Sequence, residues 1–314
     1  MIDNLWFWLG FGAFILTMLA LDLGVFHRKS HTVSMREAVT WTSVWVVLAT
    51  LFGWWIWSTR GSAAGIEFYT GYLIELSLSA DNVFVFSIIF SYFAVPPAYQ
   101  HKVLFWGVLS ALVLRFLMIW CGAALVERFL WLLYIFGAFL IITGIKMLCA
   151  KDAHHDPEAS FIVKLFRRFV PTSDQFDGDR FLTLRHGRRL ATPLLLVLVC
   201  VEVSDVIFAV DSIPAIFAIT RDPFIVFTSN VFAIMGLRSL YFLLAEAVEK
   251  FHLLRPALGI ILSFVGVKML LGHTDYKIPT PVALGVVLLV LVGSVVGSLI
   301  WPKPSGEPRN PETA

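Results

Sequence analysis

Long uninterrupted apolar runs are the feature that most constrains the fold of this 314-residue chain. A helix needs about 20 mostly apolar residues to cross a bilayer core of about 30 Å. Several runs approach that length, and we predict an all-α polytopic membrane protein with about nine transmembrane helices in a single transmembrane domain, residues 1–314. The predicted spans are residues 5–26, 40–57, 68–93, 103–126, 129–149, 191–219, 223–245, 256–272 and 281–301.

The basic residues between the spans predict the orientation of the chain. If the N-terminus lies outside, 16 of them fall on the inner side and 4 on the outer side. Because Lys and Arg are enriched in cytoplasmic loops, we expect an outside N-terminus and a cytoplasmic C-terminus. Half of the inner residues lie in the polar insertion 150–190, in which residues 161–169 could form a short surface helix. The formal net charge of +2, without a basic stripe, argues against a nucleic-acid partner.

The chain contains an internal repeat. Residues 107–115 match 230–238, and 144–148 match 266–270, at offsets of 123 and 122. Each repeat holds three spans, an odd number, so the second must be inserted upside down relative to the first. Inverted repeats are typical of secondary transporters, which bind substrate near the midplane where the repeats meet. The predicted parts are repeat 1 at about 68–149, the cytoplasmic loop 150–190, repeat 2 at about 191–272, and the peripheral spans 5–26, 40–57 and 281–301.

Acidic residues lie within two of the predicted spans. An acid at the centre of a membrane helix costs about 2.5 to 3.5 kcal/mol, so several of them need a compensating partner such as a cation. Oxygen ligands without thiol or imidazole suit hard divalent ions such as Mn, Mg or Ca. The candidate metal ligands are Glu75, Asp81 and Asn82 in the first repeat and Glu202, Asp205, Asp211 and Ser212 in the second.

The spacing of the acids leaves two geometries open. Glu75 and Asp81 are six residues apart, as are Asp205 and Asp211. On an intact helix this separates two side chains by about 120° and about 9 Å. Either each helix breaks between its acids, which would add backbone carbonyls as ligands, or each acid faces a different neighbour. Pro214 would favour a break, because proline removes a backbone hydrogen bond.

Four basic residues also fall within spans. Arg115 and Arg238 are expected to be structural, either paired with the acids or extending to the membrane surface, and so to support the site. The alternative to a metal site is that the acids are structural as well, each paired with Arg115, Arg238 or a lysine to hold the bundle together. Lys146 and Lys268 lie near span ends and are expected to extend to the surface. Asp22, at the inner end of the first span, would by default face the interface but could extend an ion path toward the cytosol.

Several segments carry a family resemblance. The segment from Asp81 to Phe86, the segment from Glu202 to Phe217, and the opening 21–26 and 31–38 resemble the TerC family of integral membrane proteins, in particular its Alx-like branch. The resemblance implies manganese export and resistance, with an older association with tellurite resistance, and it assigns the seven candidate ligands to the acidic motifs of the family. The chain departs from the family after Glu75, where members more often have lysine and alanine.

The function expected from the residues and the resemblance is export of Mn²⁺ across the bacterial inner membrane in exchange for protons, without enzymatic activity or a permanently bound cofactor. The expected partners are the metal ion, protons and the lipid bilayer. One alternative is a metallation or assembly partner of the secretion machinery. Another is a protein of tellurite or redox stress resistance. The three cysteines form no CxxC motif, and carboxylates would repel an oxyanion, so the last alternative is disfavoured.

Overall fold

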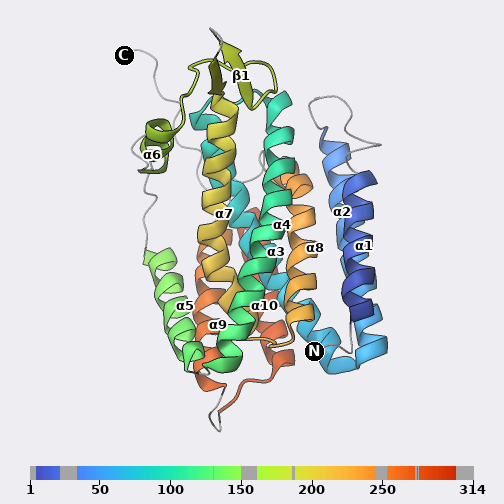
Figure 1. Cartoon of the computed structure of the whole chain (residues 1–314). Helices are drawn as coiled ribbons and strands as arrows, with labels where there is room; N and C mark the ends of the chain where they lie inside the picture. The colour runs from blue at the N-terminus through green and yellow to red at the C-terminus, as the bar shows by residue number, and fades with distance from the viewer. Residues whose placement is uncertain are drawn as a thin grey trace.

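The protein is an elongated bundle of α-helices with a small β-hairpin at one end (Figure 1). The computed structural model describes residues 5–21, 34–129, 131–149, 161–185, 188–244, 253–272, 274 and 276–301. The helices within these residues are α1 (Leu5–Leu21), α2 (Met35–Arg60), α3 (Ser62–Tyr92), α4 (Pro97–Arg128), α5 (Leu132–Cys149), α6 (Phe161–Phe169), α7 (Pro193–Phe217), α8 (Pro223–Leu244), α9 (Leu254–Leu271) and α10 (Thr280–Ile300). The strands are β1 (Leu182–Arg185) and β2 (Arg188–Ala191).

Six helices of the described part are long and apolar enough to cross a membrane. They are α2, Pro97–Val126 of α4, α5, α7, Pro223–Leu243 of α8, and α10. Shorter apolar helices lie within α1 and α9, at Phe7–Met18 and Pro256–Leu271. α3 is 31 residues long but carries three acids and is not among the six. The helical, multi-pass character is therefore confirmed, and each predicted span overlaps one helix of the described residues. The number of nine spans stays a prediction.

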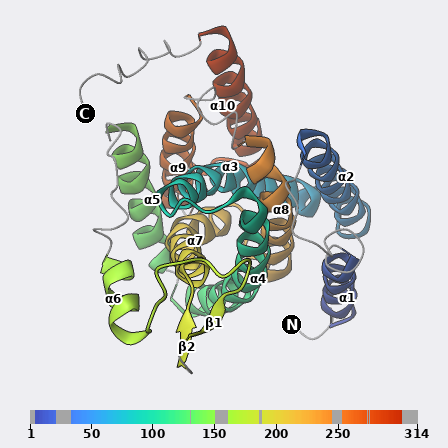
Figure 2. The same ribbon diagram turned by 90° about the horizontal axis from the view of Figure 1, so that it is seen from above.

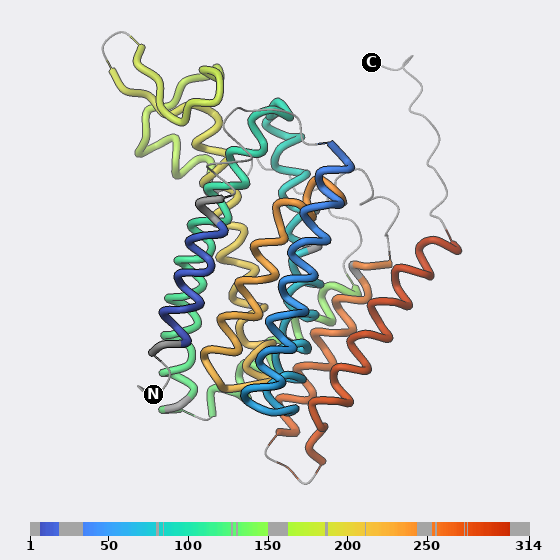
Figure 3. Tube along the Cα trace, turned by 90° about the vertical axis from the view of Figure 1, so that its right-hand side faces the viewer, coloured from blue at the N-terminus to red at the C-terminus, as the bar shows by residue number. Residues whose placement is uncertain are grey.

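Four helices form the centre of the bundle. Seen from above, α3, α4, α7 and α8 lie together, with α5, α9 and α10 on one side and α1 and α2 on another (Figure 2). α10 runs beside α9 at the edge of the bundle (Figure 3). α1 is held by aromatic packing, because the ring of Phe11 lies 5.3 Å from that of Phe52 in α2 and 5.9 Å from that of Phe232 in α8. The acid-bearing helices α3 and α7 each contact several neighbouring helices.

The helix pairs of the bundle occur in matched sets. α3 packs on α8 as α7 packs on α4, and α9 contacts α3 as α5 contacts α7. Three further pairs, α3 with α7, α4 with α8, and α5 with α9, each join two helices that the sequence repeat relates. A two-fold exchange of α3–α5 with α7–α9 would convert each of these seven pairs either into itself or into another of the seven.

Glycines allow α5 and α9 to approach closely. A Cβ atom added to Gly266 would lie 2.7 Å from the carbonyl oxygen of Gly137, and one added to Gly259 would lie 2.8 Å from that of Gly144. Gly137 thus meets Gly266 while Gly144 meets Gly259, so the two helices run antiparallel. Small residues at such a crossing are a common means of packing helices within a membrane.

Replacing Gly266 with valine is expected to destabilise the bundle, because the added carbons collide with the backbone of α5. Overpacking of this kind costs about 1 to 3 kcal/mol. Thermal unfolding in detergent should show a lower Tm for Gly266→Val. The control is Gly285→Val in α10, where an added Cβ meets nothing within 4 Å. An equal loss of Tm in both variants would contradict the close crossing.

The segment 161–192, here called the cap, covers the start of α7 (Figure 1). It consists of α6 and an antiparallel hairpin in which Leu182 pairs with Ala191. Lys102 of α4 fixes the cap, since its Nζ donates to the carbonyl oxygen of Asp179 at 2.6 Å and to its carboxylate at 3.1 Å. The predicted helix at 161–169 is confirmed as α6, whereas the hairpin was not predicted.

Candidate ion-binding site

The two acid-bearing helices are continuous. α3 runs unbroken from Ser62 to Tyr92, and α7 from Pro193 to Phe217 with Pro214 inside its last turn. The hydroxyl of Ser77 donates to the carbonyl of Leu73 one turn earlier, and so leaves the helix intact. The broken-helix alternative is therefore wrong. On these intact helices, positions six residues apart lie about 120° apart around the helix axis.

A buried arginine joins the acids of the two helices. Nη2 of Arg115 lies 2.8 Å from Oδ1 of Asp205, and Nε lies 3.3 Å from Oδ2, which makes the contact bidentate. Nη1 of the same guanidinium forms an ion pair with Oε1 of Glu75. Arg115 is 1% exposed, Glu75 0% and Asp205 3%. Of the two alternatives expected for Arg115, pairing with the acids is the one that the structure shows.

This triad is not neutral by formal charge. Two carboxylates, from Glu75 and Asp205, share one guanidinium, so full ionisation would leave one negative charge without a partner. Uncompensated charge is costly in a low-dielectric interior. The triad therefore carries one formal negative charge more than its arginine compensates.

Glu202 extends the acidic face of α7 toward α4. It lies three residues before Asp205, and the hydroxyl of Ser110 in α4 donates to its Oε1. Both acids thus contact α4, at Ser110 and Arg115. Glu202 and Asp205 therefore share the face of α7 that lies against α4.

Buried polar atoms without hydrogen-bond partners lie on the same helices. Buried polar atoms in proteins are almost always paired, so such atoms are candidates for binding an ion or water. Within the described part of the chain, such atoms on α3, α7 and α8 include Oε2 of Glu75, Oγ of Ser79, Oδ1 of Asn82, Oε2 of Glu202, Oγ of Ser212, and both amide atoms of Asn230; the hydroxyl of Tyr92, at the cap end of α3, is another. Four of these residues, Glu75, Asn82, Glu202 and Ser212, were predicted as ligands.

Three residues at the site were missed from the sequence. Ser79, Ser110 and Asn230 are polar residues within apolar helices, and the side chains of Ser79 and Asn230 are fully buried. The usable signal was their position, because Ser79 lies between the two acids of α3 and the other two lie in the repeated segments 107–115 and 230–238.

Part of the predicted site lies outside what the structure describes. Asp81 and Asp211 occupy turns of α3 and α7, but their side chains are not among the described ones, and Asp22 lies outside the described residues. No group of three or more His, Cys, Asp or Glu residues in the described part could hold a metal ion. The seven-residue metal site therefore stays a prediction.

The other basic residues of the helices lie apart from Arg115. Arg238 lines a small cavity between α2, α4 and α8, together with Glu37, His101 and Ser239. Lys268 is 7% exposed, and its Nζ donates to the carbonyl oxygen of Ala218 at the end of α7, at a distance of 2.6 Å. The prediction that Lys268 reaches the membrane surface is therefore wrong, because it caps the C-terminal end of a neighbouring helix instead.

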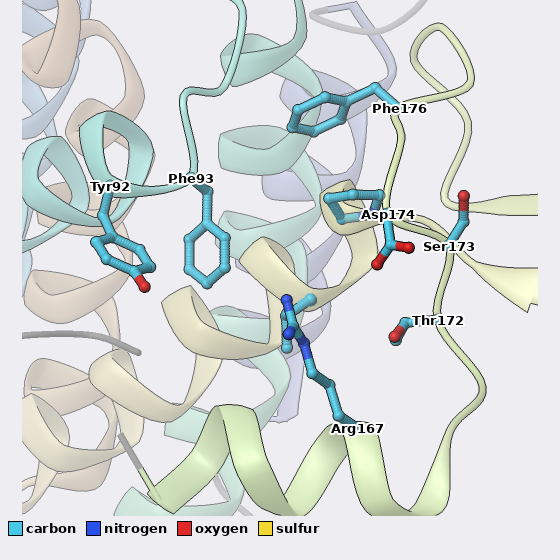
Figure 4. Close-up of a pocket in the computed structure, with 9 residues that line it drawn as sticks. Tyr92, Phe93, Arg167, Thr172, Ser173, Asp174 and Phe176 are labelled. Atoms are coloured by element: carbon cyan, nitrogen blue, oxygen red, sulfur yellow. The ribbon is translucent and has the colours of Figure 1, made fainter. Parts of the chain in front are cut away.

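A cavity of about 550 Å³ opens where both acid-bearing helices meet the cap. It is lined by Tyr92 and Phe93 at the end of α3, Leu196 at the start of α7, and Arg167 and Asp174 of the cap. In Figure 4 the side chains of Phe93, Arg167 and Asp174 point into the same space. Water can therefore approach the ends of α3 and α7 on the cap side.

Comparison with known proteins places the chain in a family. Residues 60–305 match the model of the integral membrane protein TerC family. An uncharacterized membrane protein of Myxococcus xanthus is 55% identical over 93% of this chain and 92% of its own length. Alx of Escherichia coli (strain K12), which carries a provisional name as a membrane-bound redox modulator, is 49% identical over 91% of each chain. No solved structure matches. The chain therefore belongs to the TerC family of integral membrane proteins.

Proposed function

We propose that this protein exports a hard divalent cation, manganese by the family resemblance, across the bacterial inner membrane. The observation that carries the proposal is the convergence of Glu75 from α3 and Asp205 from α7 on one buried guanidinium, that of Arg115. Acids buried among apolar helices mark ion pathways in membrane proteins. The unpartnered oxygens on the same helices and on α8 are ligands of the kind that Mn²⁺, Mg²⁺ and Ca²⁺ prefer.

The proposed transport mechanism is alternating access between two inverted repeats. The matched helix pairs support this arrangement, as does the antiparallel crossing in which Gly137 meets Gly266 and Gly144 meets Gly259. The repeat offset of 122 relates Gly137 to Gly259 and Gly144 to Gly266, so exchanging the repeats converts the first of these contacts into the second. Such symmetry provides two related states with the site between the repeats, as in other secondary transporters.

Arg115 acts in this mechanism as a resident cation. It holds Glu75 and Asp205 while the site lacks substrate, and a divalent ion replaces it, since the charge of two carboxylates matches that of one dication. A guanidinium and a dication a few Å apart repel each other strongly in a low-dielectric site, so the two exclude each other. In the absence of substrate, the arginine thereby provides a positive partner for the buried carboxylates of Glu75 and Asp205.

Protons are the proposed counter-ions. Protonation of a carboxyl group removes the charge that holds the metal, and burial favours the neutral form. An acidic exterior therefore promotes release on the outer side, while the less acidic cytosol favours metal binding. With the N-terminus outside and the C-terminus cytoplasmic, as the basic residues predict, the cap and its cavity lie on the side from which the metal is taken up.

A redox role is the second candidate, because the name of Alx describes a redox modulator. Cys121 and Cys149 are exposed on α4 and α5, Cys200 is buried in α7, and all three are free thiols. A dithiol switch would need two of them to approach within bonding distance. The sequence also offers no nucleotide-binding motif that would supply electrons. Neither feature favours electron transfer over ion transport.

Purified protein in liposomes is expected to carry Mn²⁺ into the lumen, and to do so faster when the lumen is the more acidic side. The measurement is quenching of a metal-sensitive dye trapped inside, with Mg²⁺ and Ca²⁺ compared and protein-free liposomes as the control. Absence of protein-dependent flux for all three ions would contradict the proposal. That result, with recovery of secretion components in pull-downs, would favour the metallation partner instead.

A further inference from the structure

The internal repeat relates the two intramembrane arginines and two of the acids. Residues 115 and 238 are 123 positions apart, and residues 75 and 205 are 130 positions apart. The helices follow the same relation, because α4, which carries Arg115, packs on α7, while α8, which carries Arg238, packs on α3. The packing is matched in detail as well. Gly107 of α4 lies against Val201 of α7. The repeat offsets convert this contact into one between position 230 and Gly71, and Gly71 of α3 lies against Ser229 of α8, one residue from that position.

The two arginines nevertheless have different surroundings. Arg115 is fully buried between Glu75 and Asp205. Arg238 is half-buried and lines a cavity to which α2 contributes Glu37. Because α2 lies outside the repeat, Arg115 has no counterpart of Glu37. The structure is therefore symmetric in its helix packing and asymmetric in the placement of its arginines.

Exchanging the conformations of the two repeats turns an inverted-repeat carrier toward the other side of the membrane. The exchange converts the contact of Arg115 with Asp205 into a contact of Arg238 with Glu75. It converts the contact of Arg115 with Glu75 into one of Arg238 with Asp205. We propose that Arg238 replaces Arg115 between these two acids when the carrier opens to the other side, an inference that rests on the proposed alternating-access transport.

The depth of Arg238 in the bundle permits this replacement. α7 and α8 are joined at one end of the bundle by residues 218–222. Asp205 lies 12 positions before Phe217, and Arg238 lies 15 positions after Pro223. At 1.5 Å per residue, their backbones are about 18 Å and about 22 Å from that end. The difference of about 4 Å is one that a long, flexible arginine side chain can bridge.

The exchange explains why a carrier would hold two arginines for one pair of acids. Two guanidiniums at the same buried acids would repel each other, so only one can occupy the place at a time. A bound dication neutralises both carboxylates without either arginine. The arginines therefore stabilise the empty carrier, one in each of its two states, and Arg238 is a positioning residue that does not ligate the ion.

The first test is a double-mutant cycle on the Tm of the full-length protein in detergent, without added metal. If Arg238 can replace Arg115, each single methionine variant keeps one arginine for the acids. The double variant Arg115→Met/Arg238→Met is then expected to lose more Tm than the sum of the single losses. Combining Arg115→Met with Arg238→Lys, which keeps the positive charge, should return the loss to near the single value. A double variant whose loss equals the sum would overturn the proposal.

The second test uses Arg238→Met alone and reads hydrogen exchange at the two ends of α7. Loss of Arg238 removes the partner of the other state, so the carrier should stay in the state described here, with its cavity at the cap. Exchange should become faster in residues 193–200 and slower in residues 210–217, while Ser239→Ala, which lines the same cavity as Arg238, changes neither. Changes of the same sign at both ends would overturn the proposal. Since neither test uses a transported ion, failure of manganese flux and failure of the arginine exchange are separate results.

Discussion

Replacing Arg115 with methionine is expected to lower the free energy of unfolding by about 3 kcal/mol, the lower end of the range for breaking a buried ion pair. The substitution leaves Glu75 and Asp205 buried without the guanidinium that both contact. The loss stays at the lower end because Arg238 can supply a replacement charge. Denaturant titration of the purified protein in mild detergent measures the change.

Two controls separate the loss of the ion pair from the loss of packing. Arg115→Met combined with Glu75→Gln and Asp205→Asn should recover most of the stability, because no buried charge is then left unpaired. Arg60→Met removes an arginine that lies 2.8 Å from Asp222, where the side chains are 15% and 39% exposed. Partly exposed pairs contribute about 1 kcal/mol or less, so this variant should lose much less than Arg115→Met. Equal losses in the two single variants would contradict the central role of the Arg115 triad.

The helices of this fold could be predicted from hydropathy because a membrane helix satisfies its own backbone hydrogen bonds. The continuity of α3 and α7 was harder to predict. Serine and proline weaken a helix in general, but Ser77 bonds within its own helix. Pro214 removes only its own bond to the carbonyl of Val210, and α7 continues past it to Phe217. The hairpin of the cap was missed because β1 and β2 are only four residues each, too short for a pattern to show.

The partners within the site could be predicted only in part. The cost of buried charge required that the acids and Arg115 find partners, and they did so. Which acids Arg115 contacts depends on the axial position of α4 relative to α3 and α7. The sequence of one helix does not determine that position. Lys268 shows the same limit. Its position near a helix end suggested the membrane surface, whereas the end of α7 lies within its reach and offers unpaired carbonyl groups.

Replacing Asp205 with asparagine is expected to reduce Mn²⁺ flux in liposomes about 100-fold or more. The change removes one of the two carboxylate charges that converge on the site. It also replaces a carboxylate oxygen, which only accepts hydrogen bonds, with an amide NH₂ group, whose hydrogens repel a metal ion. A loss of about 3 kcal/mol of ion binding corresponds to a factor of about 100.

Asp81→Asn and Asp211→Asn are expected to abolish manganese tolerance in a strain that lacks its own exporter, at normal protein levels.

Asp222→Asn is the matched control, because it removes the same charge from the connection between α7 and α8, outside the site. Asp222 accepts from Arg60 and from the backbone amide of Phe224, so its loss should cost some stability but not transport. If all acid variants transport poorly, Asp222→Asn included, the effect comes from charge or folding in general. If Asp205→Asn transports normally, the pairing of Glu75 and Asp205 with Arg115 only holds the bundle together. Loss in Asp205→Asn with flux retained in Asp222→Asn would mean that the acids gathered by the two repeats carry the ion.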